Sequence, residues 1–329
     1  MATNIWFWVG FIAFVLAMLA LDLGVFQRKA HEVRPREAGI WVAVWVALAL
    51  AFAGGLAYFR GSATAVEFLT GYVIEESLSV DNLFVMVVIF EYFAVPAAFQ
   101  HRVLFYGILG ALVMRGLFIG VGAFLLSRFD WILYVFGAML LVTGVRMIFK
   151  HDEEFDGDNN RLVQVMRRFV PMTKSYHGKH FFTVENGRRL ATPLLLVLVL
   201  VEFTDLIFAV DSIPAIFGIT RDPFIVFTSN IFAILGLRSM YFLLAAVIDK
   251  FYLLKYGLAL ILSFIGVKML GERWFHINVL VSLAVVLGVL ALSVVASLVW
   301  RERERAPEIV RTEGRTGSIF GTMRRRERP

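Results

Sequence analysis

Long apolar segments alternate with short polar ones along most of the chain. Each apolar segment is about 20 residues long, which is the length an α-helix needs to cross the hydrocarbon core of a bilayer. The pattern predicts nine membrane-spanning helices, at residues 5–26, 40–59, 66–92, 102–125, 131–149, 193–217, 223–248, 253–270 and 275–300. We therefore expect an all-α polytopic membrane protein, because only helices and closed barrels satisfy their backbone hydrogen bonds within lipid.

Composition agrees with this fold class and narrows the chemistry. The 329 residues are 59% hydrophobic, whereas soluble chains are about 45–50% apolar. The mean hydropathy is +0.76. Cysteine is absent, which excludes disulfides, thiolate metal sites and cysteine nucleophiles. Neither an HExxH nor a GxGD motif occurs, so we do not expect an enzyme.

Basic residues lie mainly on one side of the predicted membrane. With the N-terminus outside, the inner segments hold 24 of the 32 Lys and Arg residues, and the outer segments hold four. The positive-inside rule then predicts an N-out, C-in orientation. We expect the membrane to be a bacterial inner membrane. The net charge of +6 is explained by this asymmetry, so no nucleic-acid partner is expected.

Three pairs of motifs indicate an internal repeat. Asp81 aligns with Asp205, Arg115 with Arg238, and "GVRM" at 144–147 with "GVKM" at 266–269, at offsets of 124, 123 and 122 residues. The topology makes the two three-helix units inverted copies, an arrangement typical of secondary transporters.

The repeat divides the chain into six parts. They are two N-terminal helices (1–65), the first repeat (66–149), a cytoplasmic loop (150–192), the second repeat (193–270), the ninth helix (271–300) and a basic cytoplasmic tail (301–329). In the loop, "RLVQVMRRFV" predicts an amphipathic helix and Asn186-Gly187 predicts a hairpin turn.

Six acids fall within the third and sixth predicted spans, where a charged side chain costs about 2.5–3.5 kcal/mol at the helix centre. They are Glu75, Glu76, Asp81, Glu202, Asp205 and Asp211. Arg115 and Arg238 could neutralise two of them, so protons, water or a bound cation should compensate for the rest. The acids do not share one helical face, and Pro214 predicts a helix break near Val210 that would let Asp211 turn.

Oxygen ligands without cysteine favour hard divalent cations such as Mg²⁺, Ca²⁺ or Mn²⁺. Other polar residues could support the ligands or line the path of the ion. These are Asp22, Glu76, Ser79, Thr204, Ser212, Arg115 and Arg238. Asp22 could equally cap a helix or join an exit path.

The chain resembles the TerC family, which is named for tellurite resistance. The resemblance lies in "LDLGVF", "EESLSVDNLFV", "MRG", "ENGRRLATPL" and "EFTDLIFAVDSIPAIF", in family order along the chain. It implies manganese export, with Mn²⁺ as the transported ion rather than a cofactor. It also implies the metal ligands Glu75, Asp81, Asn82, Glu202, Asp205 and Asp211.

We therefore expect a proton-coupled manganese exporter whose partners are Mn²⁺, protons and the lipid bilayer. Two alternatives stay open. One is an exporter of calcium or another divalent cation. The other is a membrane scaffold or insertion helper, which the resemblance also implies for some relatives.

Overall fold

The structure is a computed structural model that describes residues 5–26, 35–149, 160–173, 175–185, 187–245 and 253–312. The side chains at 21–26, 35, 167 and 300–312 lie outside this description. The described ranges form ten helices and one hairpin: α1 (Ile5–Phe26), α2 (Pro35–Arg60), α3 (Ser62–Tyr92), α4 (Ala97–Arg128), α5 (Ile132–Phe149), α6 (Arg161–Phe169), β1 (Phe182–Glu185), β2 (Arg188–Ala191), α7 (Pro193–Phe217), α8 (Pro223–Ala245), α9 (Leu254–Leu270) and α10 (Val279–Thr312).

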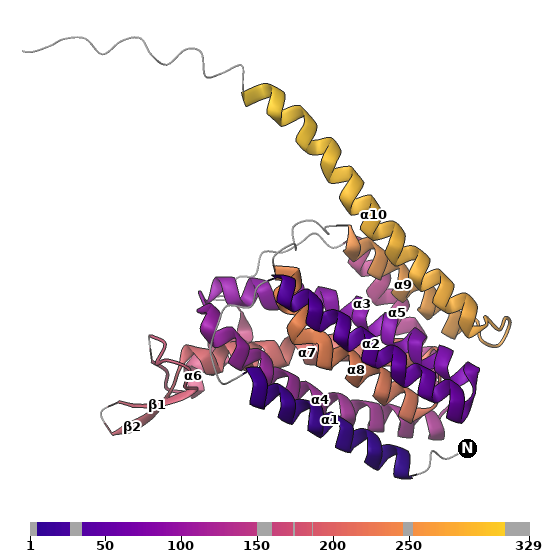
Figure 1. Ribbon diagram of the computed structural model, residues 1–329, viewed down its shortest axis with the longest axis horizontal. Helices are drawn as coiled ribbons and strands as arrows, with labels where there is room; N and C mark the ends of the chain where they lie inside the picture. Colours follow the sequence, from indigo (N-terminus) through magenta and orange to yellow (C-terminus); the bar gives the residue numbers. More distant parts are fainter. Residues whose placement is uncertain are drawn as a thin grey trace, which may run out of the picture.

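Each of the nine predicted spans coincides with a long helix of the bundle (Figure 1). Within the described residues, six helices are long and apolar enough to cross a membrane, judged by length and composition alone. They are α2, α4, α5, α7, α8 and α10. α9 has only 17 residues, and α3 carries five acids along its 31 residues. The prediction of an all-α polytopic membrane protein is confirmed.

Polar residues fix where several helices begin. Asp222 accepts a hydrogen bond from the Phe224 backbone N–H at 2.9 Å, and Pro223 follows it as the first residue of α8. Asn278 similarly accepts from the Leu280 N–H at 2.9 Å, so α10 begins at Val279 rather than at residue 275. α10 then continues to Thr312 and leans away from the bundle (Figure 1).

α8 is the central helix of the bundle. It packs against α2, α3 and α4, and 83% of its most apolar stretch is buried, against 11% for α10. One side of α8 joins an aromatic cluster in which the Phe232 ring lies 5.0 Å from Phe52 and 5.7 Å from Phe68. A helix that is apolar on all sides can be buried in this way.

α5 and α9 approach closely through glycines. A Cβ on Gly144 would lie 2.7 Å from the Ala259 carbonyl oxygen and would overlap Ser263. A Cβ on Gly266 would lie 2.7 Å from both the Gly137 carbonyl oxygen and the Leu141 backbone nitrogen. Only glycine fits at these two positions, as is common where membrane helices touch.

The described residues between α5 and α7 (160–173, 175–185 and 187–192) form a small unit at one end of the bundle (Figure 1). It contains α6 and the β1–β2 hairpin, and Gly187 adopts a φ of +75° at the turn. The Tyr176 hydroxyl donates to the Phe93 carbonyl oxygen at 2.7 Å and so ties this unit to the end of α3. Burial raises the pKa of Tyr176 above its usual value.

Candidate functional site

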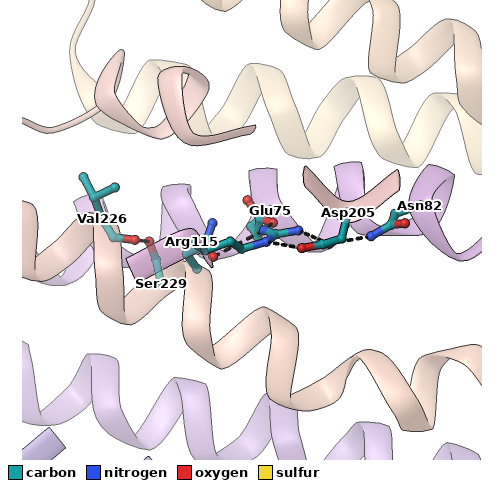
Figure 2. Close-up of polar contacts among 7 residues, drawn as sticks. Glu75, Asn82, Arg115, Asp205, Val226 and Ser229 are labelled. Carbon is teal, nitrogen blue, oxygen red and sulfur yellow. Dashed lines mark hydrogen bonds and ion pairs between the residues drawn. The ribbon is translucent and has the colours of Figure 1, made fainter. Parts of the chain in front are cut away.

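Arg115 of α4 is the centre of a buried polar cluster. Its Nε donates to Asp205 Oδ2 at 3.1 Å and its Nη2 donates to Asp205 Oδ1 at 2.7 Å, so the guanidinium binds this carboxylate in a bidentate manner. Its Nη1 donates to Glu75 Oε1 and, at 3.3 Å, to Asn230 Oδ1. Figure 2 shows the guanidinium lying between the two carboxylates.

Asn82 completes the cluster on the far side of Asp205. Its Nδ2 donates to Asp205 Oδ1 at 2.8 Å, so that this carboxylate accepts from both α3 and α4 (Figure 2). We call these five residues, each no more than 3% exposed, the Arg115 cluster: Glu75, Asn82, Arg115, Asp205 and Asn230.

The cluster joins four helices because their sequences place polar residues at matching depths. Glu75 and Asn82 are seven residues apart, two helical turns, and therefore project from the same face of α3. α4 contributes Arg115, α7 contributes Asp205 and α8 contributes Asn230. Apolar residues surround them, and a low local dielectric strengthens each charged hydrogen bond.

Several buried oxygens on α3 and α7 make no hydrogen bond in the structure. They include Glu75 Oε2, Ser79 Oγ, Asn82 Oδ1 and Ser212 Oγ. Ser79 lies between Glu75 and Asn82 on one face of α3, and Ser212 lies seven residues after Asp205 on one face of α7. Buried polar atoms are normally satisfied, so this concentration indicates a place where a ligand or water could bind.

The other predicted acids lie outside this cluster. Glu76 accepts from the Tyr72 hydroxyl at 2.8 Å, and Asp211 accepts from Thr143 Oγ1 of α5 at 3.1 Å. Glu202 packs against Gly110 of α4, where a Cβ would overlap its carboxylate.

The remaining predicted residues have separate positions. Asp81 is partly buried on α3, and Arg238 is 6% exposed on α8. Thr204 donates to the Val201 carbonyl oxygen at 2.9 Å and so bonds within its own helix. Asp22 lies in α1, but its side chain lies outside the described residues.

The predicted break near Val210 is wrong. α7 continues from Pro193 through Pro214 to Phe217. Pro214 lies in the last turn, where it removes one hydrogen bond and does not divide the helix. Asp211 therefore projects from a continuous helix toward Thr143, away from the direction of Asp205.

The geometry limits how a metal could bind. Among the described residues, no three His, Cys, Asp or Glu side chains converge closely enough to hold an ion. The Arg115 cluster offers two carboxylates, and amide and hydroxyl oxygens would have to supply the other ligands. Such oxygen sets suit hard divalent cations.

Some contacts were missed from the sequence. Asn230 stands in "TSNIF", a run of three polar residues in the middle of an apolar helix, and this signal could have revealed it. Thr143, Tyr72 and Gly110 have no comparable signal, because isolated Thr, Tyr and Gly residues are common in membrane helices.

Comparisons with known proteins cover most of the chain. The model of the family described as "Integral membrane protein TerC family" matches residues 60–305. The "Uncharacterized membrane protein STKORF319" of Myxococcus xanthus is 55% identical over 292 residues, covering 89% of this chain and 92% of the relative. No solved structure matches.

Two further relatives extend the comparison. The "Putative membrane-bound redox modulator Alx" of Escherichia coli (strain K12) is 52% identical over 295 residues, covering 87% of this chain and 92% of the relative. An "Uncharacterized membrane protein" of Rickettsia bellii is 38% identical over 292 residues, with 89% and 97% covered. Together with the multi-pass helical fold, these matches show that the chain belongs to the TerC family of integral membrane proteins.

Proposed function

We propose that the protein is a secondary transporter that exports Mn²⁺ across the bacterial inner membrane through the Arg115 cluster. The observation that carries this proposal is the position of one buried guanidinium between Glu75 of the first repeat and Asp205 of the second. A substrate site at the interface of two repeats, at mid-depth in the bilayer, is the usual arrangement in secondary transporters.

Charge balance supports a cationic substrate. With both carboxyls ionised, Glu75 and Asp205 carry two negative charges and Arg115 carries one positive charge. An uncompensated charge in a buried site is costly, so the excess favours binding of a proton or a cation. Arg115 neutralises one of the two negative charges before the cation arrives, and the cation compensates for the other.

Ligand chemistry supports a hard divalent ion. The buried oxygens on α3 and α7 that make no hydrogen bond include Glu75 Oε2, Ser79 Oγ, Asn82 Oδ1 and Ser212 Oγ. Oxygen ligands select Mg²⁺, Ca²⁺ or Mn²⁺ over softer metals. The preference for manganese rests on the family resemblance. In this proposal the carboxylates of Asp81, Glu202 and Asp211 line the path of the ion, each at a different depth in the membrane.

Packing supports the inverted repeat. Gly144 meets Ala259 and Ser263, while its repeat partner Gly266 meets Gly137 and Leu141. At the same offset of 122 residues, Gly137 and Leu141 are the counterparts of Ala259 and Ser263. The two glycines therefore make reciprocal contacts, as a two-fold relation between the repeats requires, and such units can rock against each other to alternate access.

Export needs an energy source. Moving two positive charges outward against an inside-negative potential costs roughly 4.6 kcal/mol per 100 mV. The carboxyls that bind the cation can also bind protons. Inward proton movement through the Arg115 cluster is therefore the proposed driving reaction, with the N-terminus outside and the C-terminus inside.

Manganese accumulation in cells tests this proposal. Cells that make wild type should hold less manganese than cells that make Asp205→Asn, because the variant removes the charge shared by Arg115 and Asn82. Asp130→Asn is the matched control, since its side chain is 91% exposed. Equal manganese content with wild type and Asp205→Asn, at equal amounts of folded protein, would refute the site.

Metal-dependent thermal stabilisation of the purified protein separates the candidate ions. Mn²⁺ should raise the melting temperature of wild type more than Ca²⁺, Mg²⁺, Zn²⁺ or Fe²⁺ at equal concentration. A larger shift with Ca²⁺ would assign the site to calcium export instead.

A further inference from the structure

An apolar groove lies between α1, α2 and α8, away from the Arg115 cluster. It has a volume of about 430 Å³, and six of its lining residues are Phe11, Phe14, Leu48, Phe52, Phe224 and Phe232. Trp6, Gly10 and Ala51 also line it and are exposed, so the groove opens at the surface of the bundle.

The groove is elongated along α8. Phe224 and Phe232 both line it, and eight residues of helix correspond to roughly 12 Å at 1.5 Å per residue. An apolar groove of this length, open at a surface that faces lipid, fits an acyl chain. Gly10 leaves room on one wall, because a Cβ there would meet nothing within 4 Å.

A cationic group lies next to Phe224, one of the residues that line the groove. The guanidinium carbon of Arg60, the last residue of α2, lies 5.9 Å from the centroid of the Phe224 ring. Arg60 Nη2 donates to Asp222 Oδ2 at 2.6 Å, but Nη1 is buried and makes no hydrogen bond. Arginine forms strong hydrogen bonds with phosphate oxygens, so Nη1 has the chemistry to bind one.

The positions of the two features match the shape of a phospholipid. Arg60 and Phe224 stand where α2 ends and α8 begins, which is the end of the bundle where α1 starts. Phe232 stands two turns deeper in α8. A phosphate at Arg60 would therefore sit at the membrane interface, with its acyl chain extending inward along α8.

We propose that this groove binds one phospholipid, with an acyl chain between α1, α2 and α8 and the phosphate on Arg60. The site goes beyond the proposed transport function and uses none of its residues. The bound phospholipid would hold the two N-terminal helices, α1 and α2, against the central helix α8.

Native mass spectrometry of the detergent-purified full chain tests the proposal, with dioleoyl-phosphatidylglycerol as the added lipid. Wild type should retain one lipid, and Gly10→Leu should lose it because the new side chain fills the groove. Gly288→Leu is the control, since a Cβ at Gly288 also meets nothing within 4 Å but Gly288 lies on α10.

Arg60→Gln separates the two ends of the site. The variant should weaken lipid binding about tenfold, the effect of losing one charged hydrogen bond, while the groove itself stays open. Equal lipid retention by wild type and Gly10→Leu would overturn the proposal. So would a wild-type dimer that Gly10→Leu dissociates, because a second chain would then occupy the groove.

Discussion

Replacing Arg115 with methionine tests the energetics of the Arg115 cluster. The change removes two hydrogen bonds to Asp205, one to Glu75 and one to Asn230, and leaves both carboxylates without their cation. Removing one partner of a buried ion pair costs about 3–5 kcal/mol. At about 2–4 °C per kcal/mol for a large domain, the melting temperature should fall by roughly 10 °C.

Thermal unfolding in detergent, followed by tryptophan fluorescence, measures this change. Arg146→Met is the control, because Arg146 is an exposed arginine on α5. The triple variant Arg115→Met, Glu75→Gln, Asp205→Asn should recover much of the loss, since it removes both orphaned charges. The reasoning fails if Arg115→Met melts within about 2 °C of wild type, or if the triple variant is no more stable than the single one.

Two further predictions concern packing and the 160–192 segment. Gly266→Ala should destabilise the protein by about 1–3 kcal/mol, because the new Cβ would clash with the Gly137 carbonyl oxygen. Gly120→Ala is the control and should have little effect in the same melting assay, because a Cβ there meets nothing within 4 Å. Equal effects of the two variants would contradict the close approach of α5 and α9. Tyr176→Phe should cost about 1 kcal/mol by losing the bond to the Phe93 carbonyl. Burial raises the pKa of Tyr176, so the stability that its hydroxyl contributes should be fully present below pH 10 and be lost as pH rises through the pKa of the folded protein. A stability difference between wild type and Tyr176→Phe that grows above pH 10 would contradict this.

The positions of the helices were predictable because the apolar pattern is set by the thickness of a bilayer. That Arg115, Glu75 and Asp205 would need buried partners was also predictable, since a charged side chain is costly in an apolar helix and needs a compensating partner. The seven-residue spacing of Glu75 and Asn82 places both on one face of α3, and the structure brings both into one cluster.

The partners of the other acids were not predictable. The sequence places Asp211 only six residues from Asp205, but its partner Thr143 lies 68 residues away on α5. Which side chains meet depends on how the helices are rotated about their axes, and apolar helices carry little information about rotation. The effect of Pro214 depended on where α7 ends, and α7 ends at Phe217, only three residues after the proline.

Manganese flux into proteoliposomes tests the central claim most directly. The protein is reconstituted with a proton gradient across the membrane, and Mn²⁺ movement is followed with a trapped indicator dye. Wild type and Asp130→Asn should move Mn²⁺ at similar rates that depend on the gradient, while Asp205→Asn and Glu75→Gln should be inactive. Equal flux through wild type and Asp205→Asn would contradict the account.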